Sequence, residues 1–227
     1  MSIIQNLPSH IAFIMDGNGT WAKKNNLPRS KGHEMGLKAV SKLIDNILEI
    51  GVKNITLFAL SYENSKRPKK ELKNLFSLFI KSLDDNEERI IKDKIKINFI
   101  GDRSIFPSNL IKKIEHIEKI TSKYKKLNIS IAINYGGKQD IKYAVTQMRK
   151  ENKNKVNIEN FLRSKDLPEV DLLIRTGGYR RLSNFLLWQI SYSELYFTKV
   201  LWPNFKKRDL VKAIQWYSSI DRKFGKI

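Results

Sequence analysis

The chain has 227 residues, 41% of them hydrophobic, which is enough to bury one sizeable core. It has no cysteine, which excludes disulfide frameworks and thiolate chemistry, and no apolar run reaches the ~18–20 residues that a membrane-spanning helix needs. The net charge of +20 favours a polyanionic partner such as a phosphate, an anionic lipid or a nucleic acid, although 32 of the 43 basic residues are lysines spread along the whole chain.

Short apolar runs alternate with long amphipathic segments. The apolar runs predict strands at residues 10–17, 54–60, 95–101, 127–137, 170–178 and, more briefly, within 193–203. The helical spacing of apolar residues predicts helices at 32–51, 69–85, 109–124, 139–151 and 207–221. This alternation predicts the α/β class: a mostly parallel central sheet flanked by helices, with residues 1–227 forming a single domain. The best candidate for a mobile loop is the Lys/Asn-rich stretch 150–157.

Glycine-rich or polar motifs follow four of the predicted strands. They are DGNG at 16–19, SYENSKRP at 61–68, NYGG at 134–137 and RTGGYRR at 175–181. In open parallel sheets, ligands bind beyond the carboxyl ends of the strands. We therefore expect the functional site where these motifs stand.

The first motif, IMDGNGTWAKK, combines an acid with two glycines. Gly17 and Gly19 allow backbone N–H groups to approach an anion at a helix N-terminus. Asp16 is suited to Mg²⁺, which takes carboxylate and phosphate oxygens as ligands. D-G-N-G is equally good chemistry for a plain turn between a strand and a helix, so both interpretations stand for this motif alone.

Two further polar segments lie beside Gly-, Pro- or Asn-rich breaks. PRSKGHEMG places Arg29 and His33 at a helix start, where a single histidine is more often a surface or capping residue. The loop SYENSKRP carries side chains that either act on a substrate or cap the next helix, and these are Ser61, Glu63, Asn64 and Arg67.

The motif RTGGYRR places three arginines around a Gly-Gly pair, with no acidic partner inside the loop. The planar fork of arginine suits bidentate phosphate contacts, so Arg175, Arg180 and Arg181 favour a phosphate-binding loop over the alternative of a salt-bridged surface loop. Glu194 is the nearest acid downstream and stands in the apolar context ISYSELYF. A carboxylate there is either a buried ion-pair partner or a metal ligand.

Taken together, the motifs resemble the cis-prenyltransferases, and within them the bacterial undecaprenyl diphosphate synthases. The similarity covers roughly residues 8–225 and is carried by HIAFIMDGNGTWAKK, GHEMG, S-x-E-N-x-x-R-P, NYGG and DLLIRTGGYRRLSNFLLWQISYSELYFTKVLWPNF. The resemblance implies a Mg²⁺-dependent, homodimeric transferase that adds isopentenyl diphosphate units in cis to farnesyl diphosphate and makes a long-chain polyprenyl diphosphate lipid carrier. It also implies a cytoplasmic protein with peripheral contact to the inner face of the membrane, and no nucleic-acid partner.

The same resemblance implies a role for each matching residue. Asp16 would hold Mg²⁺ on the allylic diphosphate, and Asn64 would accept the proton that is lost. Glu194 would be a second Mg²⁺ ligand that reaches across a dimer interface. The residues that would contact the substrates are Gly17, Asn18, Gly19, Thr20, Trp21, Arg29, His33, Ser61, Tyr62, Glu63, Ser65, Arg67, Arg175, Arg181, Leu182 and Ser183.

The growing hydrocarbon chain would need a dry tunnel. The candidate lining is the apolar stripe Leu72, Leu75, Phe76, Phe79 and Leu83, for which ordinary core packing is an equal alternative. The apolar run FLLWQ that follows the arginine motif is interpreted as fold and dimer core. LDDNEE at 83–88 is similar to the aspartate-rich boxes of all-helical prenyl synthases, but its single copy in an α/β pattern predicts a solvated helix end.

Three positions depart from the usual pattern of the family. Thr20 stands where an arginine is typical, Ser65 where a tryptophan is typical, and Tyr179 where a glutamate is typical. These departures suggest one alternative, a catalytically weak or inactive subunit of such an enzyme. The basic charge alone suggests another, a nucleic-acid-binding protein, for which the sequence shows no recognisable motif.

Overall fold

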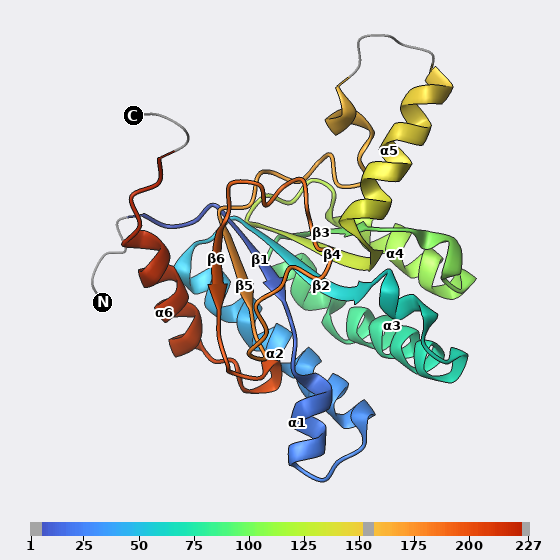
Figure 1. Ribbon diagram of the computed structural model, residues 1–227. Helices are drawn as coiled ribbons and strands as arrows, with labels where there is room; N and C mark the ends of the chain where they lie inside the picture. The colour runs from blue at the N-terminus through green and yellow to red at the C-terminus, as the bar shows by residue number, and fades with distance from the viewer. Residues whose placement is uncertain (1–5, 152–156, 224–227) are drawn as a thin grey trace. The chain divides into compact units, whose positions relative to one another are not determined.

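The computed structural model describes residues 6–151 and 157–223, and it confirms the alternation of strands and helices (Figure 1). The helices are α1 (Asn18–Lys24), α2 (Arg29–Ile50), α3 (Lys69–Lys92), α4 (Ser108–Thr121), α5 (Gly137–Glu151) and α6 (Lys207–Ser218). The strands are β1 (His10–Ile14), β2 (Asn54–Ser61), β3 (Ile95–Ile100), β4 (Leu127–Tyr135), β5 (Leu172–Arg175) and β6 (Glu194–Phe197). Most of the loop predicted to be mobile, at 150–157, lies outside the described residues.

The chain divides into two compact units. The first comprises Met1–Ile55, Glu169–Arg181 and Ile190–Ile227, and the second comprises Thr56–Pro168 and Leu182–Gln189. Strand β2 begins in the first unit and continues into the second. Each unit contains parallel strands with helices beside them, which confirms the predicted α/β class. That the two units form one domain stays a prediction.

In the first unit, β1 pairs in parallel with β5, and β5 pairs in parallel with β6. All five residues of β1 are buried, as expected for a parallel strand that is covered on both faces. Trp202 in the C-terminal segment is buried, with 1% of the residue exposed. Its indole Nε1 donates a hydrogen bond of 2.9 Å to the Gly36 carbonyl, which connects this segment to α2. The Trp202 ring also contacts Phe13 of β1 and Phe205.

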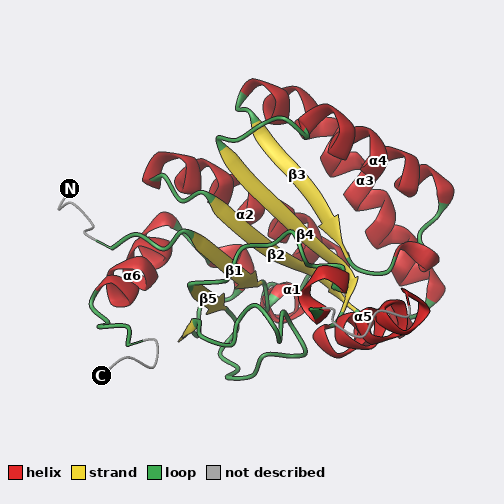
Figure 2. Cartoon of the chain, turned by 90° about the horizontal axis from the view of Figure 1, so that it is seen from above, coloured by secondary structure: helices red, strands yellow, loops and turns green. Residues whose placement is uncertain are grey.

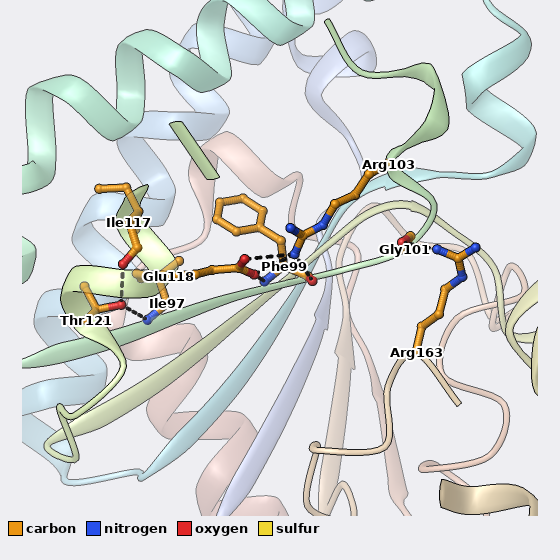
Figure 3. Close-up of polar contacts among 8 residues, drawn as sticks. All are labelled: Ile97, Phe99, Gly101, Arg103, Ile117, Glu118, Thr121 and Arg163. Carbon is orange, nitrogen blue, oxygen red and sulfur yellow. Dashed lines mark hydrogen bonds and ion pairs between the residues drawn. The ribbon is translucent and has the colours of Figure 1, made fainter. Parts of the chain in front are cut away.

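In the second unit, β3 pairs in parallel with β4, and α3 and α4 lie side by side along β3 (Figure 2). Side chains of α4 also bind the backbone of β3 (Figure 3). The Ile97 N–H donates to the Thr121 hydroxyl at 3.2 Å, and the Phe99 N–H donates to the Glu118 carboxylate at 2.9 Å. Arg103 pairs with the same carboxylate at 2.7 Å, so this charge is both hydrogen-bonded and neutralised.

A buried carboxylate organises the region around α5. Asp140 is 3% exposed and accepts hydrogen bonds from the Tyr135 hydroxyl at 3.2 Å, the Ser164 hydroxyl at 2.5 Å and the Arg163 N–H at 2.7 Å. Burial and the Asp140 charge raise the pKa of Tyr135 far above its usual range, so its hydroxyl remains a donor. The Gln189 amide donates to Ser164 at 2.7 Å, which ties the segment 182–189 to the same carboxylate.

The main correction concerns α3, which ends at Lys92 and not near residue 85. LDDNEE therefore lies inside the helix and not at its end. The apolar stripe continues from Leu83 to the buried Ile90, two turns later, which explains why the helix goes on. Asp84 and Glu87 are held by Lys113 of α4 at 2.5 and 2.6 Å, so the acidic run makes ion pairs at the surface.

Candidate active site

The first and last motifs of the sequence meet in the first unit. Because Ile14 stands opposite Arg175 in the β1–β5 register, the residues after both strands emerge side by side. The Arg175 guanidinium donates to the Asp16 carboxylate at 2.8 Å and is itself only 2% exposed, whereas about a third of the Asp16 side chain is exposed. The Thr176 hydroxyl donates to the Asp16 carbonyl at 2.7 Å. The acid and the buried cation thus form an ion pair, and Thr176 holds the backbone of the acid.

The DGNG turn is positioned by two glycines of α2. A Cβ atom added at Gly32 would lie 2.2 Å from the Asn18 carbonyl oxygen, and one added at Gly36 would lie 2.6 Å from the Asn18 side-chain oxygen. Only glycine therefore lets α2 approach the first turn of α1 this closely. This contact accounts for the two glycines of the motif GHEMG. Within the described residues, the buried Asn18 side-chain oxygen has no hydrogen-bond partner.

The other residues predicted around this turn differ in their surroundings. The Arg29 side chain passes near Gly19, where an added Cβ would lie 3.7 Å from the guanidinium Nε. The Trp21 indole donates to Asn204 at 3.0 Å, so this residue has a structural bond besides its predicted ligand role. Thr20 is exposed, and His33 is half-buried one turn after Arg29 on α2.

The RTGGYRR loop is held by its own arginine and by the segment after β6. The Gly177 and Gly178 N–H groups donate to the Val200 and Thr198 carbonyls at 2.8 and 2.9 Å. Both glycines have φ of 87°, a conformation that other residues rarely adopt. Arg175 also donates to the Arg181 carbonyl, so the loop closes back onto the buried cation. The Arg181 guanidinium itself is exposed and lies over the Tyr179 ring.

Glu194 begins β6 and stands near a cation. The Arg222 Nε lies 4.0 Å from the Glu194 carboxylate, and the Arg222 guanidinium bonds to Asp171 at 2.9 Å and to the Tyr217 hydroxyl at 2.8 Å. Burial opposes the charge of Arg222, but the hydrogen bonds with Asp171 and Tyr217 raise its pKa, so it remains a cation. Glu194 is only half-buried and lies at the limit of an ion pair with Arg222, so it is not the buried ion-pair partner of the first interpretation, and the metal role stays a prediction.

The SYENSKRP loop lies in the second unit and forms a 3₁₀ turn at Glu63–Lys66. The Ser61 hydroxyl accepts from the Asn64 N–H at 3.2 Å, the Ser65 hydroxyl donates to the Tyr62 carbonyl at 2.6 Å, and Arg67 pairs with Glu71 at 3.1 Å. The two serine contacts stabilise the turn itself and do not cap α3, whose N-cap residue Pro68 has no side-chain cap hydrogen bond, so the capping interpretation lacks support. A role for Asn64 in catalysis stays a prediction.

Sequence reasoning missed Asn184, which joins three parts of the second unit. Its side-chain amide donates to Glu63 and to Gln139, both at 2.8 Å, and its side-chain oxygen accepts from the Lys138 N–H at 2.8 Å. An added Cβ at Gly136 would lie 2.3 Å from the Gln139 side-chain oxygen and 2.5 Å from the Asn184 amide nitrogen, so the first glycine of NYGG leaves room for this hydrogen-bonded pair. The signal in the sequence was an asparagine directly before an apolar run, a residue type that tolerates the positive φ of 63° found here.

Leu182 and Ser183 precede this asparagine, Leu182 half-buried and Ser183 exposed with φ of 51°. Phe185 and Leu186 are fully buried, which confirms the interpretation of FLLWQ as core, whereas its place in a dimer is not tested. In the candidate tunnel stripe, Phe76 is buried against Phe106. Leu83 is also buried, while Leu72, Leu75 and Phe79 are half-buried, and the tunnel stays a prediction.

The predicted site residues thus fall into two groups. The first unit holds Asp16, the DGNG turn, Arg29, His33, Arg175, Arg181 and Glu194, and the second unit holds Ser61 to Arg67, Leu182 and Ser183. Across residues 6–151 and 157–223 there is no cluster of three or more His, Asp or Glu side chains suited to a metal ion. Mg²⁺ commonly takes only one or two carboxylates together with substrate phosphates and water, so the partly exposed Asp16 fits it. In the same part of the chain, no helix is long and apolar enough to cross a membrane.

Comparison with known proteins agrees with this arrangement. Residues 14–225 match the family model described as putative undecaprenyl diphosphate synthase. An isoprenyl transferase of Fusobacterium nucleatum is 44% identical, with 97% of each chain covered. A ditrans,polycis-undecaprenyl-diphosphate synthase of Vibrio vulnificus, specific for (2E,6E)-farnesyl diphosphate, is 43% identical, with 97% of this chain and 92% of that protein covered.

Among solved structures, the chain is similar to lavandulyl diphosphate synthase from Lavandula x intermedia in complex with dimethylallyl diphosphate. The TM-score is 0.92 at 31% identity, and the alignment covers 97% of this chain and 99% of the other. This agreement confirms the fold class over nearly the whole length. The chain therefore belongs to the prenyltransferase family that is described by the undecaprenyl diphosphate synthase model.

Proposed function

We propose that this protein condenses isopentenyl diphosphate with an allylic diphosphate, farnesyl diphosphate, with cis geometry, and makes a long-chain polyprenyl diphosphate. The observation that carries the proposal is the contact between the buried Arg175 and the partly exposed Asp16 at the ends of β5 and β1. A cation and an acid of this kind suit a diphosphate and its counterion. Relatives with 43–44% identity carry the names of such transferases.

The predicted site residues would bind two different diphosphates, the allylic one and isopentenyl diphosphate. Asp16 would hold Mg²⁺ on the allylic diphosphate, and the bound ion would neutralise the charge that develops on this leaving group. The Gly17–Gly19 turn, Arg29 and His33 would bind the same diphosphate. Arg175, Arg181 and Ser183 would hold the isopentenyl diphosphate, and the Asn64 side-chain oxygen would take the proton that is lost when the new double bond forms.

The proposal includes an assembly and a location. A homodimer would let Glu194 contribute a second Mg²⁺ contact to the partner, at a position where Arg222 now lies 4.0 Å away. Peripheral contact with the cytoplasmic face of the membrane would place the lipid product at its destination, and the surplus of lysine favours such a surface.

The test is a chain-elongation assay. The purified protein is incubated with farnesyl diphosphate, radiolabelled isopentenyl diphosphate and Mg²⁺, and the product is extracted and its carbon number is measured by mass spectrometry. We expect a polyprenyl diphosphate whose length is set by the enzyme, and no product when a chelator removes Mg²⁺. No elongation with any allylic primer, from a folded protein, would favour the alternative of an inactive subunit that the positions Thr20, Ser65 and Tyr179 suggest.

A further inference from the structure

Tyr179 is an aromatic residue inside a loop of cations. Its ring is 52% exposed, so burial in a core does not explain why it is there. The Arg181 guanidinium carbon lies over this ring at 4.1 Å from the centroid, and the Arg175 guanidinium carbon lies at 5.9 Å from it. A cation over an aromatic face within about 6 Å is attracted by the ring, and the shorter contact is well inside this limit.

The contact has a particular consequence for the chemistry of Arg181. Attraction to the ring does not occupy the guanidinium N–H groups as an acidic partner would, so they can still bind an anion in bidentate fashion. A carboxylate partner would instead occupy those N–H groups and cancel the charge. Within residues 6–151 and 157–223, Arg181 makes no ion pair with an acidic side chain. The ring thus restrains the cation without neutralising it.

The backbone on either side fixes the ring and the cation in this relation. The Gly177 and Gly178 N–H groups are bonded to Val200 and Thr198, and the Arg181 carbonyl accepts from the buried Arg175. Tyr179 lies between these two attachment points. A long, exposed arginine normally samples many rotamers, and fixing one of them on binding costs free energy. A ring that already holds the arginine reduces that cost.

We propose that Tyr179 is a positioning residue that holds Arg181 ready for the diphosphate of isopentenyl diphosphate. This inference rests on the proposed function of Arg181 as a diphosphate ligand. It assigns the aromatic ring, and not the phenol hydroxyl, as the active feature. Tyr179 would act on the binding of that one substrate and not on the chemical step.

The experiment compares the wild type with Tyr179→Phe and Tyr179→Ala. The control is Tyr192→Ala, which removes another exposed tyrosine, 68% exposed, from the same unit. We expect Tyr179→Ala to raise the KM for isopentenyl diphosphate about two- to five-fold, the effect of losing one exposed cation–π contact. The KM for farnesyl diphosphate and kcat should stay unchanged. Tyr179→Phe should behave like the wild type.

An unchanged KM in Tyr179→Ala, or a loss in Tyr179→Phe equal to that in Tyr179→Ala, would overturn the inference while leaving the proposed function intact. If the wild type elongates no primer, the proposed function fails and the inference is tested by direct titration with inorganic pyrophosphate. The wild type and Tyr179→Phe should then bind pyrophosphate equally, and Tyr179→Ala should bind it about two- to five-fold more weakly. A wild type that binds no pyrophosphate would contradict the inference as well.

Discussion

Asp16 and Arg175 are a pair in which the two partners have unequal access to solvent. The guanidinium is almost completely buried, and the carboxylate is about one third exposed. A buried cation that loses its counter-charge is costly, so Asp16 supports the fold besides its proposed metal role. A substitution at this position must separate the two effects.

We predict that Asp16→Asn and Asp16→Ala both lower kcat at least about 100-fold, because neither offers a carboxylate to the leaving diphosphate and its metal ion. Asp16→Ala should also lower the free energy of unfolding by about 2–3 kcal/mol, because Arg175 is then buried without a charged partner. Asp16→Asn keeps an oxygen that can accept the hydrogen bond and should lose less stability. Urea denaturation and the elongation assay measure the two effects. The control is Asp85→Asn on the exposed face of α3. Near-normal turnover of Asp16→Asn would refute the metal role of Asp16.

At the scale of elements, the sequence predicted the alternation of strands and helices because parallel strands are continuously apolar and helices repeat every 3–4 residues. It placed the end of α3 too early, because the acidic run at 83–88 looks like a helix end unless Lys113 of a different helix is known to bind it. It also missed Asn184, whose partners Glu63 and Gln139 are 121 and 45 residues away. Contacts of this kind leave no periodic signal in a single sequence.

The contact between α1 and α2 can be tested at Gly36. Alanine is favoured over glycine inside a helix by about 1 kcal/mol, so Gly36→Ala would stabilise an isolated α2. In the folded protein the new methyl group would lie 2.6 Å from the Asn18 side chain. We therefore predict a net destabilisation of about 1–3 kcal/mol and a loss of elongation activity, because the Asn18 side chain in the DGNG turn must shift. Thermal unfolding and the assay measure both. The control is Lys38→Ala on the same helix. A Gly36→Ala variant that is more stable than the wild type and fully active would contradict this account.

At the scale of the whole molecule, the net charge of +20 does not identify a particular binding partner, because the lysines are spread along the chain. It does predict a general affinity for anionic surfaces that salt weakens, because the Debye length is only about 8 Å at physiological ionic strength.

We predict that the protein cosediments with vesicles that contain anionic phospholipid and does not cosediment with purely zwitterionic vesicles. The binding should fall as salt is raised toward about 0.5 M, because screening shortens the range of the attraction. Duplex DNA of equal charge concentration is the comparison. Suppose that the protein binds DNA more tightly than it binds the anionic vesicles, with a steep salt dependence. This result would support the nucleic-acid alternative, and the membrane proposal would lose its main support.

The polar contacts between α4 and β3 bear on how copies of this chain can aggregate. Thr121 and Glu118 occupy the Ile97 and Phe99 N–H groups, the donors that another extended chain would need for pairing along this strand. An incoming strand must displace both side chains and break the pair of Glu118 with Arg103 before it gains a hydrogen bond. This edge of β3 is therefore a poor template for fibre growth. The protection comes from two side chains of a neighbouring helix, so it is lost wherever that helix unfolds locally, even while β3 and β4 remain paired.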